Sequence, residues 1–281
     1  MIILYGDQLK KREETHIDIE DRAYQFGDGI YEVIRVYHGK TFYMKEHLER
    51  LEKSAKKIRI NLPYSLKRLE ELLNQLIKQN DFTQGNIYLQ VSRGTAPRTH
   101  AFPANSTPLL IAYPQPAKRP VKEQAEGISA ITVKDIRWLL CDIKSLNLLG
   151  AVLAKQEAYD HHCKEAIFIR DGIVTEGSST NLFIVKDGML LTHPADHFIL
   201  HGITRKITLQ LADQLQIPVS EKKFDKDALF DADEIFITST TMEICPVVEV
   251  DKKRIGNGKP GQITKRLQEA FQQLILSKTK A

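Results

Sequence analysis

A chain of 281 residues in which 42% of the side chains are hydrophobic and 27% are charged has the balance of an ordinary globular protein, with length for about two domains. This composition excludes a disordered chain, a collagen and a coiled coil. The 40 Lys and Arg residues exceed the 36 Asp and Glu residues by only four and form no basic block, so charge gives no reason to expect nucleic-acid binding.

The first part of the chain predicts strands and helices in alternation. Residues 30–37 alternate apolar and polar side chains, as a half-buried strand does, and residues 41–44 pair back on them after a His-Gly-Lys turn. Leucines at helical spacing predict two amphipathic helices, over residues 45–58 and 66–77. This order of elements indicates a domain that combines helices with a sheet.

A proline-rich segment follows two further predicted strands, at 86–92 and 109–113, which a polar loop joins over residues 93–108. Three prolines stand within residues 114–120, and such a segment cannot belong to a helix or a central strand. We therefore expect an interdomain linker here. The predicted division is an N-terminal domain over 1–115, a linker over 116–122 and a C-terminal domain over 123–281.

The second part of the chain is richer in strands. Asp-Gly pairs at 171–172 and 187–188 are typical of tight hairpin turns. Strands are predicted over residues 128–134, 165–170, 181–186, 189–192, 234–239 and 244–250, and helices over 146–160, 204–214 and 263–276. The whole pattern indicates the α+β class.

Membrane and export signals are weak. The longest uninterrupted apolar run, at 148–154, is far below the roughly 20 residues that a spanning helix needs. The N-terminus lacks the basic segment and long apolar core of a signal peptide. Cys141, Cys163 and Cys245 are odd in number and show no CxxC spacing, which predicts reduced thiols, packed as small core residues, in a cytoplasmic protein.

Two patterns are tempting but unconvincing. The glycines at 256–261 fit GxGxxG, but a dinucleotide site needs a second strand and an acidic residue about 20 residues on, so a glycine-rich turn is the better interpretation. His193, His197 and His201 are spaced by four, as helical metal ligands are, but Pro194 and Gly202 would break that helix. No metal is expected.

Lys144 and Glu176 are candidates for chemistry. Lys144 is the only basic residue from Trp138 through Ala154, so its amine is either partly desolvated and nucleophilic, or at the surface of a strand-to-helix corner. Glu176 precedes Gly177 and three hydroxyl residues, a sequence that suits either a pocket edge or a simple turn.

Three other segments could bind an anion. Residues 202–205 (GITR) open a predicted helix whose first N–H groups and dipole suit a phosphate. Residues 238–241 are four hydroxyl residues in a row at the end of a strand, and Arg50 lies on the helix at 45–58. Each of these is, by itself, equally consistent with a cap, a turn or an exposed side chain.

Together these segments resemble the fold-type IV pyridoxal-phosphate enzymes. The resemblance rests on DRAYQFGDGIYE at 21–32, HLERL at 47–51, the segment around Lys144, residues 176–183, GITR at 202–205 and STT at 239–241. Their co-linear order, ending at the turn at 258–261, is more specific than any single segment. It implies a two-domain α+β fold, with a smaller N-terminal α/β domain and a larger, mixed β-barrel-like C-terminal domain bearing helices.

The resemblance also implies roles for these residues. The cofactor would be pyridoxal 5′-phosphate, with Lys144 as the catalytic residue that binds it covalently and moves the substrate proton. Glu176 would face the pyridine nitrogen and keep it protonated. Arg50, Ile203, Thr204 and Thr240 would hold the phosphate.

The loop at 93–103 resembles that of the D-amino-acid aminotransferases in this family. In that resemblance Arg98 and His100 bind the substrate carboxylate, a task that suits a guanidinium and an imidazole, and Tyr31 adds a hydroxyl. The loop would reach the active site of a partner subunit, which implies a homodimer. His201 departs from the family pattern, which predicts an altered pocket near Leu200 without altered chemistry.

The expected activity is transfer of the amino group from a D-amino acid such as D-alanine to a 2-oxo acid such as 2-oxoglutarate, which gives D-glutamate, by a two-half-reaction (ping-pong) mechanism. The alternative is a branched-chain L-amino-acid aminotransferase or an aminodeoxychorismate lyase of the same fold. The expected partners are small molecules and a second subunit, not nucleic acid or membrane.

Overall fold

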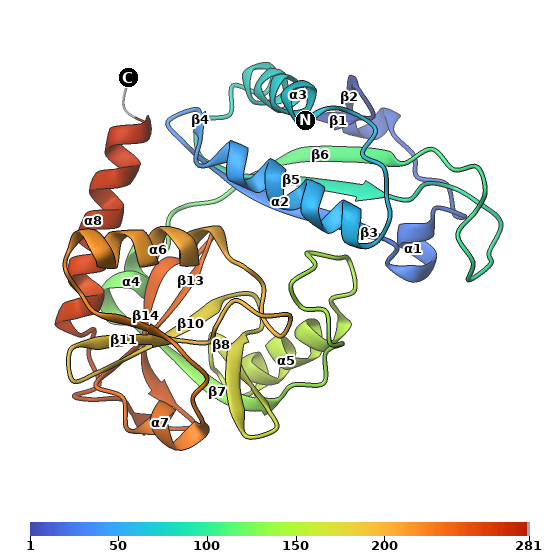
Figure 1. The fold of residues 1–281 in the computed structure, drawn as a ribbon. Coiled ribbons are helices and arrows are strands. Elements are labelled where there is room, and N and C mark those ends of the chain that lie inside the picture. The colour runs from blue at the N-terminus through green and yellow to red at the C-terminus, as the bar shows by residue number, and fades with distance from the viewer. Residues whose placement is uncertain (280–281) are drawn as a thin grey trace. The chain divides into compact units, whose positions relative to one another are not determined.

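The described residues, 1–279 of a computed structural model, divide into two units (Figure 1). The first unit comprises residues 1–118, the short segment Ile143–Asn147 and the C-terminal residues from Lys278. The second comprises Arg119–Asp142 and Leu148–Ser277. Residues 280–281, which end the predicted C-terminal domain, lie outside the described residues.

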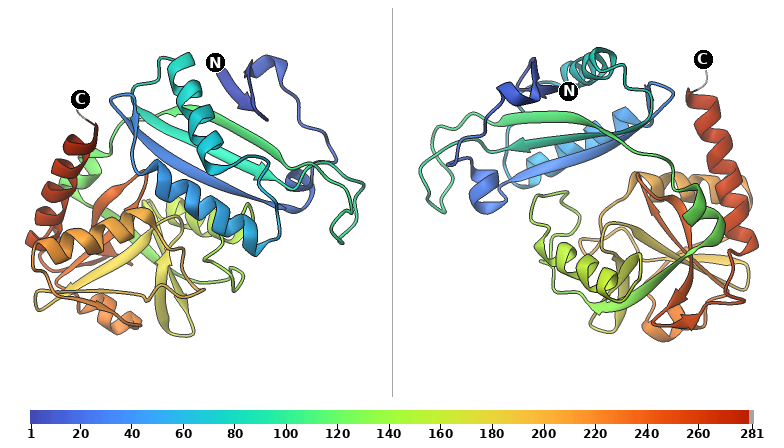
Figure 2. Two further views of the ribbon diagram at one scale, coloured as in Figure 1. Left: turned by 45° about the horizontal axis from the view of Figure 1, so that its top comes forward. Right: turned by 180° about the vertical axis from the view of Figure 1, so that it is seen from behind.

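The first unit is a sheet in the order β2-β1-β6-β5-β3-β4, in which neighbouring strands pair antiparallel. Its strands are β1 (Ile2–Tyr5), β2 (Gln8–Lys11), β3 (Gly29–Tyr37), β4 (Lys40–Thr41), β5 (Gly85–Ser92) and β6 (Leu109–Pro116). Its helices are η1 (Arg12–Glu14), α1 (Arg22–Phe26), α2 (Met44–Lys57) and α3 (Leu66–Gln79). Helices α2 and α3 cover one face of the sheet (Figure 2).

The core of the first unit forms because strand and helix periodicities place apolar side chains on facing surfaces. Leu48 and Leu51 of α2 and Leu69 and Leu73 of α3 are buried in the same cluster as Ile34 of β3. Such burial stabilises each side chain by roughly 1.5–3 kcal/mol. Both helices and the strands predicted over residues 30–37 and 86–92 are confirmed. The strand predicted over residues 41–44 is wrong in its bounds, because β4 covers only Lys40–Thr41 and α2 already begins at Met44.

The proline-rich segment begins inside a strand, so the first residue of the predicted linker, Pro116, still belongs to the sheet. Strand β6 extends through Pro114 and Pro116, which pair with Ile87 and Gly85 of β5. On its other side β6 pairs with β1 only at Ile111 and Ala112. The prolines therefore occupy a free edge, where a missing N–H breaks no ladder bond.

The second unit contains a mixed sheet in the order β12-β11-β10-β13-β14-β7-β8-β9, with β15 paired to β14. Its strands are β7 (Ile128–Lys134), β8 (Glu165–Arg170), β9 (Ile173–Gly177), β10 (Asn181–Lys186), β11 (Met189–Thr192), β12 (Val219–Glu221), β13 (Glu234–Ser239), β14 (Glu243–Val250) and β15 (Lys253–Arg254). Its helices are α4 (Val121–Glu126), α5 (Leu149–Asp160), α6 (Ile203–Gln214), α7 (Lys226–Phe230) and α8 (Gln262–Thr279). Helix α5 packs against β7 and β8, and α6 against β13 and β14.

Both Asp-Gly turns are confirmed. Asp171 and Gly172 have φ angles of 50° and 79°, and Asp187 and Gly188 have 49° and 76°. Positive φ at both central residues is the geometry of a type I′ turn, which matches the twist of the strands it joins. The glycine-rich segment at 256–261 likewise forms a turn before α8, as expected.

The helix predicted to begin at residue 146 begins instead at Leu149. The preceding residues are not helical because they form a short, irregular edge segment along the start of β3. Ser145 bridges Ile30, the N–H of Tyr31 donates to the carbonyl of Lys144 at 3.1 Å, and that of Leu146 donates to Gly29 at 3.0 Å. The main chain around Lys144 is therefore fixed by hydrogen bonds of its own.

Candidate functional site

Lys144 extends from this edge segment of the first unit. Its N–H donates to the hydroxyl of Ser54 in α2 at 3.2 Å, and its ammonium nitrogen lies 4.3 Å from the centre of the Tyr31 ring. The side chain is half-buried. The structure thus brings together two of the residues singled out in the sequence, a lysine amine and a tyrosine.

Arg50 is oriented by a buried carboxylate on β3. Its Nε and Nη2 donate to Glu32 at 2.7 and 2.9 Å, and Nδ1 of His47 lies 2.7 Å from the same carboxylate. Glu32 is fully buried, and burial alone would raise its pKa, but the charge of Arg50 and these hydrogen bonds hold the pKa well below its usual range. Burial lowers the pKa of His47, so this imidazole is neutral near pH 7 and its Nδ1–H donates. An ionised Glu32 fixes the guanidinium in a bidentate geometry.

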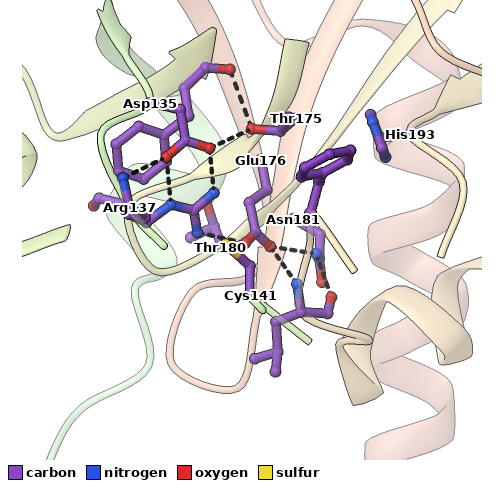
Figure 3. Close-up of polar contacts among 12 residues, drawn as sticks. Asp135, Arg137, Cys141, Thr175, Glu176, Thr180, Asn181 and His193 are labelled. Carbon is purple, nitrogen blue, oxygen red and sulfur yellow. Dashed lines mark hydrogen bonds and ion pairs between the residues drawn. The ribbon is translucent and has the colours of Figure 1, made fainter. Parts of the chain in front are cut away.

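Glu176 lies at the end of β9 in the second unit, where three donors converge on its carboxylate (Figure 3). Nη1 of Arg137 donates to Oε1 at 2.6 Å, and Nδ2 of Asn181 and the N–H of Leu200 each donate to Oε2 at 3.0 Å. A carboxylate has about four lone-pair sites, so about one remains for a ligand donor. Glu176 is 4% exposed, which makes an unpaired charge there costly.

Arg137 is itself fixed from behind by Asp135, as Figure 3 shows. Its Nε and Nη2 each donate to Asp135 at 2.9 Å, and its guanidinium lies 4.1 Å from the centre of the Phe168 ring. Arg170 also contacts Asp135, at 3.0 Å. These contacts lock the arginine that meets Glu176, so the acid has one defined orientation.

The protonation of Glu176 is set by two opposing effects. Burial raises its pKa from the ordinary 4.5 to about 7, although Arg137 and the hydrogen bonds from Arg137 and Leu200 pull it down. This pKa lies close to neutral pH, so small changes around the carboxyl group decide whether Glu176 is ionised.

The raised pKa of Glu176 predicts that the stability of the protein without ligand depends on pH. Because the folded pKa lies above the unfolded one, the contribution of Glu176 is complete below about pH 4.5 and is lost as pH rises through about 7. Between these pH values the free energy of unfolding of the wild type should therefore fall by up to about 3 kcal/mol more than that of Glu176→Gln. Urea unfolding of both proteins across this range checks it, and equal losses would contradict it.

The start of α6 lies beside this acid. Asn181 bonds both Glu176 and the carbonyl of Leu200, and a side chain at Gly202 would collide with its Oδ1, so glycine is required at this N-cap. The first turn of α6 has no side-chain cap and no acidic residue, and Ile203 and Thr204 supply N–H groups without intrahelical acceptors. Such a helix start suits a phosphate.

The remaining residues singled out in the second unit lie in loops. Thr240 stands in the turn between β13 and β14, half-buried. The histidines 193, 197 and 201 lie in the irregular segment before α6 rather than on a helix. His201 is exposed, and its ring contacts the carbonyl of Asp196 at 3.1 Å. Over residues 1–279 no cluster of His, Cys, Asp and Glu is placed to hold a metal.

Arg98 and His100 stand in the loop between β5 and β6 of the first unit. Both side chains are exposed and lie on the ring of Phe26, at 5.0 Å and 5.6 Å from its centre. Tyr31, the third residue predicted to bind a carboxylate, lies on β3, where its ring stacks on Tyr88 at 5.9 Å.

Sequence reasoning missed Glu32, Arg137 and Asp135. Glu32 could have been found, because it occupies a core-facing position in the alternation of residues 30–37, between Ile30 and Ile34. The Asp-Ile-Arg sequence at 135–137 gives a weaker signal: its two charged residues are on one side of an extended segment.

Comparison with known proteins gives a family match and full-length relatives. A family model described as amino-transferase class IV matches residues 29–250. The D-alanine aminotransferase of Bacillus licheniformis is 50% identical over 279 residues, which cover 99% of each chain. That of Listeria monocytogenes is 48% identical over 275 residues, which cover 96% of this chain and 95% of the other.

The similar solved structures are enzymes named for branched-chain amino acids rather than for D-alanine. The branched-chain amino acid aminotransferase of Escherichia coli has a TM-score of 0.95 at 30% identity, covering 99% of this chain and 96% of that one. A branched-chain enzyme from T.th., solved with pyridoxamine 5′-phosphate, has a TM-score of 0.91 at 27% identity, covering 99% and 95%. Among residues 1–279, no helix combines the length and apolar character needed to cross a membrane.

Proposed function

Because the chain belongs to the class IV aminotransferase family, we propose that it moves the amino group of a D-amino acid such as D-alanine to a 2-oxo acid. The expected acceptor is 2-oxoglutarate, which leaves as D-glutamate. The observation that carries this proposal is the 45–50% identity to D-alanine aminotransferases over nearly the whole chain. The residues of the Arg98 loop support it.

The cofactor of this family is pyridoxal 5′-phosphate, and the donor set fits it. Glu176 keeps one acceptor site and a pKa near 7 for a protonated ring nitrogen. The uncapped start of α6 offers N–H groups for a phosphate. When bound, the protonated ring takes up the electron pair that is left when a proton departs from the α-carbon of the substrate.

We assign the proton transfer to Lys144. Its amine would bind the cofactor covalently and, once displaced by the amino group of the substrate, would take the α-proton at Nζ and pass it on to the cofactor. The fixed main chain on both sides of Lys144 supports this role, because proton transfer needs a donor and acceptor held within hydrogen-bond reach.

The phosphate is assigned to Arg50 and the N-terminus of α6. The bidentate contact with Glu32 orients Arg50, and the N–H groups of Ile203 and Thr204 would bind phosphate oxygens. Thr240 would add a hydroxyl.

The substrate carboxylate is assigned to Tyr31, Arg98 and His100. The exposed guanidinium of Arg98 and imidazole of His100 both contact the ring of Phe26, so one loop holds the two donors close together. A hydrogen bond between a charged donor and a carboxylate is worth about 1.5–3 kcal/mol.

For this reason we expect Arg98→Ala to raise the KM for D-alanine by about 10- to 100-fold. The bound cofactor should keep its visible absorption, because Arg98 does not contribute to its site. Steady-state kinetics and absorption spectra test this, with Arg68→Ala, at a partly exposed position on α3, as control. An unchanged KM would refute the carboxylate role.

The rival activities differ in substrate and can be separated by one set of assays. Similarity of the backbone to branched-chain enzymes leaves the substrate open, since one fold serves several substrates. Purified protein should aminate 2-oxoglutarate from D-alanine but not from L-leucine or L-alanine, and should not release pyruvate from aminodeoxychorismate. Preference for L-leucine would favour the branched-chain alternative.

We also propose a homodimer in which the Arg98 loop reaches the active site of the partner subunit. Exposed apolar side chains support association: Ile136, Leu139, Leu149, Val152 and Leu153 are 53–71% exposed. Large exposed apolar side chains are common where protein surfaces meet. Light scattering after size exclusion tests it. The cytoplasmic location remains a prediction from the cysteine pattern.

A further inference from the structure

The loop that carries Arg98 and His100 is long and has no regular secondary structure. It joins β5, which ends at Ser92, to β6, which begins at Leu109, and the stretch between them contains no helix or strand. Residues 97–102 are exposed. A loop of this length needs outside contacts to offset the entropy of ordering it.

Arg22 of α1 supplies such a contact at the tip of the loop. Its Nη1 donates to the carbonyl of Thr99 at 2.7 Å, and its Nη2 lies 3.5 Å from the carbonyl of His100. Arg22 is only 3% exposed. Thr99 lies between Arg98 and His100 in the sequence, and the second carbonyl belongs to His100 itself. Arg22 therefore binds the main chain that carries both side chains assigned to the carboxylate.

Asp28 holds Arg22 in place and links it to the base of the loop. It accepts from Nε of Arg22 at 2.8 Å and from Nε and Nη2 of Arg93 at 2.8 and 2.9 Å. Arg93 also donates to the carbonyls of Ile58 and Arg59 after α2, at 2.8 and 2.9 Å. Burial would raise the pKa of Asp28, but Arg93 and Arg22 hold it low, so the acid is ionised.

Phe26 provides the surface on which the loop side chains rest. Besides Arg98 and His100, the guanidinium of Arg22 lies 4.8 Å from its centre. The ring of Phe26 therefore contacts Arg22 as well as the two side chains that Arg22 would position.

We propose that Arg22 is a positioning residue for substrate recognition: by holding the carbonyls of Thr99 and His100, it presents Arg98 and His100 together to the α-carboxylate. This inference rests on the proposed function, which assigns the carboxylate to those two residues. It predicts that Arg22 governs substrate affinity through the loop and leaves the proton transfer untouched.

The test is a double-mutant cycle between Arg22→Lys and Arg98→Ala. Lysine keeps a charge beside Asp28 but cannot bond both carbonyls and the acid at once. Arg22→Lys alone should raise the KM for D-alanine and for 2-oxoglutarate about tenfold, with kcat within about twofold and cofactor absorption unchanged. In the Arg98→Ala background only His100 remains to be positioned, so the same change should raise KM by clearly less, about threefold. Arg68→Lys is the matched control.

Three results separate the hypotheses. An unchanged KM in a folded Arg22→Lys protein, or a full additional increase in the double variant, would overturn the positioning role while the effect of Arg98→Ala stands. Failure of the proposed function has another signature, because Arg98→Ala alone then leaves KM unchanged. If Arg22→Lys does not fold, Phe26→Leu takes its place in the cycle, since it removes the shared ring without removing a charge.

Discussion

Replacement of Lys144 by Ala should lower the rate of transamination between D-alanine and 2-oxoglutarate by about 10⁴-fold or more, the scale seen when a covalent catalyst is removed. Alanine offers no amine that could bind the cofactor or carry the proton. The fold should survive, because the hydrogen bonds of this segment are made by the main chain of Lys144 with Tyr31 and Ser54.

The measurement combines a coupled assay with chemical labelling. Borohydride reduction of the wild-type holoenzyme, followed by digestion, should place a phosphopyridoxyl label on the peptide that contains Lys144. The exposed Lys134→Ala on β7 serves as control and should behave as wild type. Turnover near the wild-type rate in Lys144→Ala, or label on a different peptide, would remove the residue from its assigned role.

Replacement of Glu176 by Gln should lower kcat by about 10²- to 10³-fold, the usual cost of losing one electrostatic partner in a dry site. Glutamine is neutral at every pH and offers one acceptor oxygen to three donors, those of Arg137, Asn181 and Leu200. It can neither balance a protonated ring nitrogen nor satisfy these donors.

Glu234→Gln is the matched control for this substitution. Glu234 is a carboxylate of the same unit that accepts from the N–H groups of Ile263 and Thr264 at the start of α8. Its replacement should lower thermal stability without a comparable loss of kcat. Equal kcat values in both variants, or a wild-type kcat in Glu176→Gln, would mean that Glu176 acts through stability alone.

The regular elements with strong periodicity could be predicted from sequence because local physics decides them. Helices α2 and α3 follow from leucines at helical spacing, and the Asp-Gly turns from residues that tolerate positive φ. Strands β1 and β2 were not predicted, because each has only four residues and therefore shows little alternation. The helix at 149–160 began later than predicted because tertiary pairing with β3 overrode local preference at Ser145.

The residues of the candidate site likewise differ in how well the sequence predicts them. Lys144, Glu176 and Arg50 stand in segments whose resemblance is specific, so sequence sufficed to single them out. Arg137 could not be singled out in this way, because its importance comes from a hydrogen bond to Glu176, 39 residues further along the chain. Contacts between distant charges depend on strand register, which a single sequence does not reveal.

The substrate class could not be inferred from the fold. Solved structures with TM-scores of 0.95 and 0.91 are branched-chain enzymes, whereas the relatives at 45–50% identity are D-alanine enzymes. A shared backbone fixes where the elements run. Side chains on surface loops commonly decide which small molecule fits such a backbone.

The assignment of Ile143–Asn147 to the first unit has a consequence for biosynthesis. A nascent chain released from the ribosome only as far as Lys118 already holds β1 to β6, yet it lacks the strip that completes the edge of β3. That strip arrives only after Arg119–Asp142 have been translated. Lys144 therefore joins the first unit late, by a contact between residues as far apart in sequence as Ile30 and Ser145. A gene fragment cut at the apparent boundary would therefore yield a sheet without its lysine.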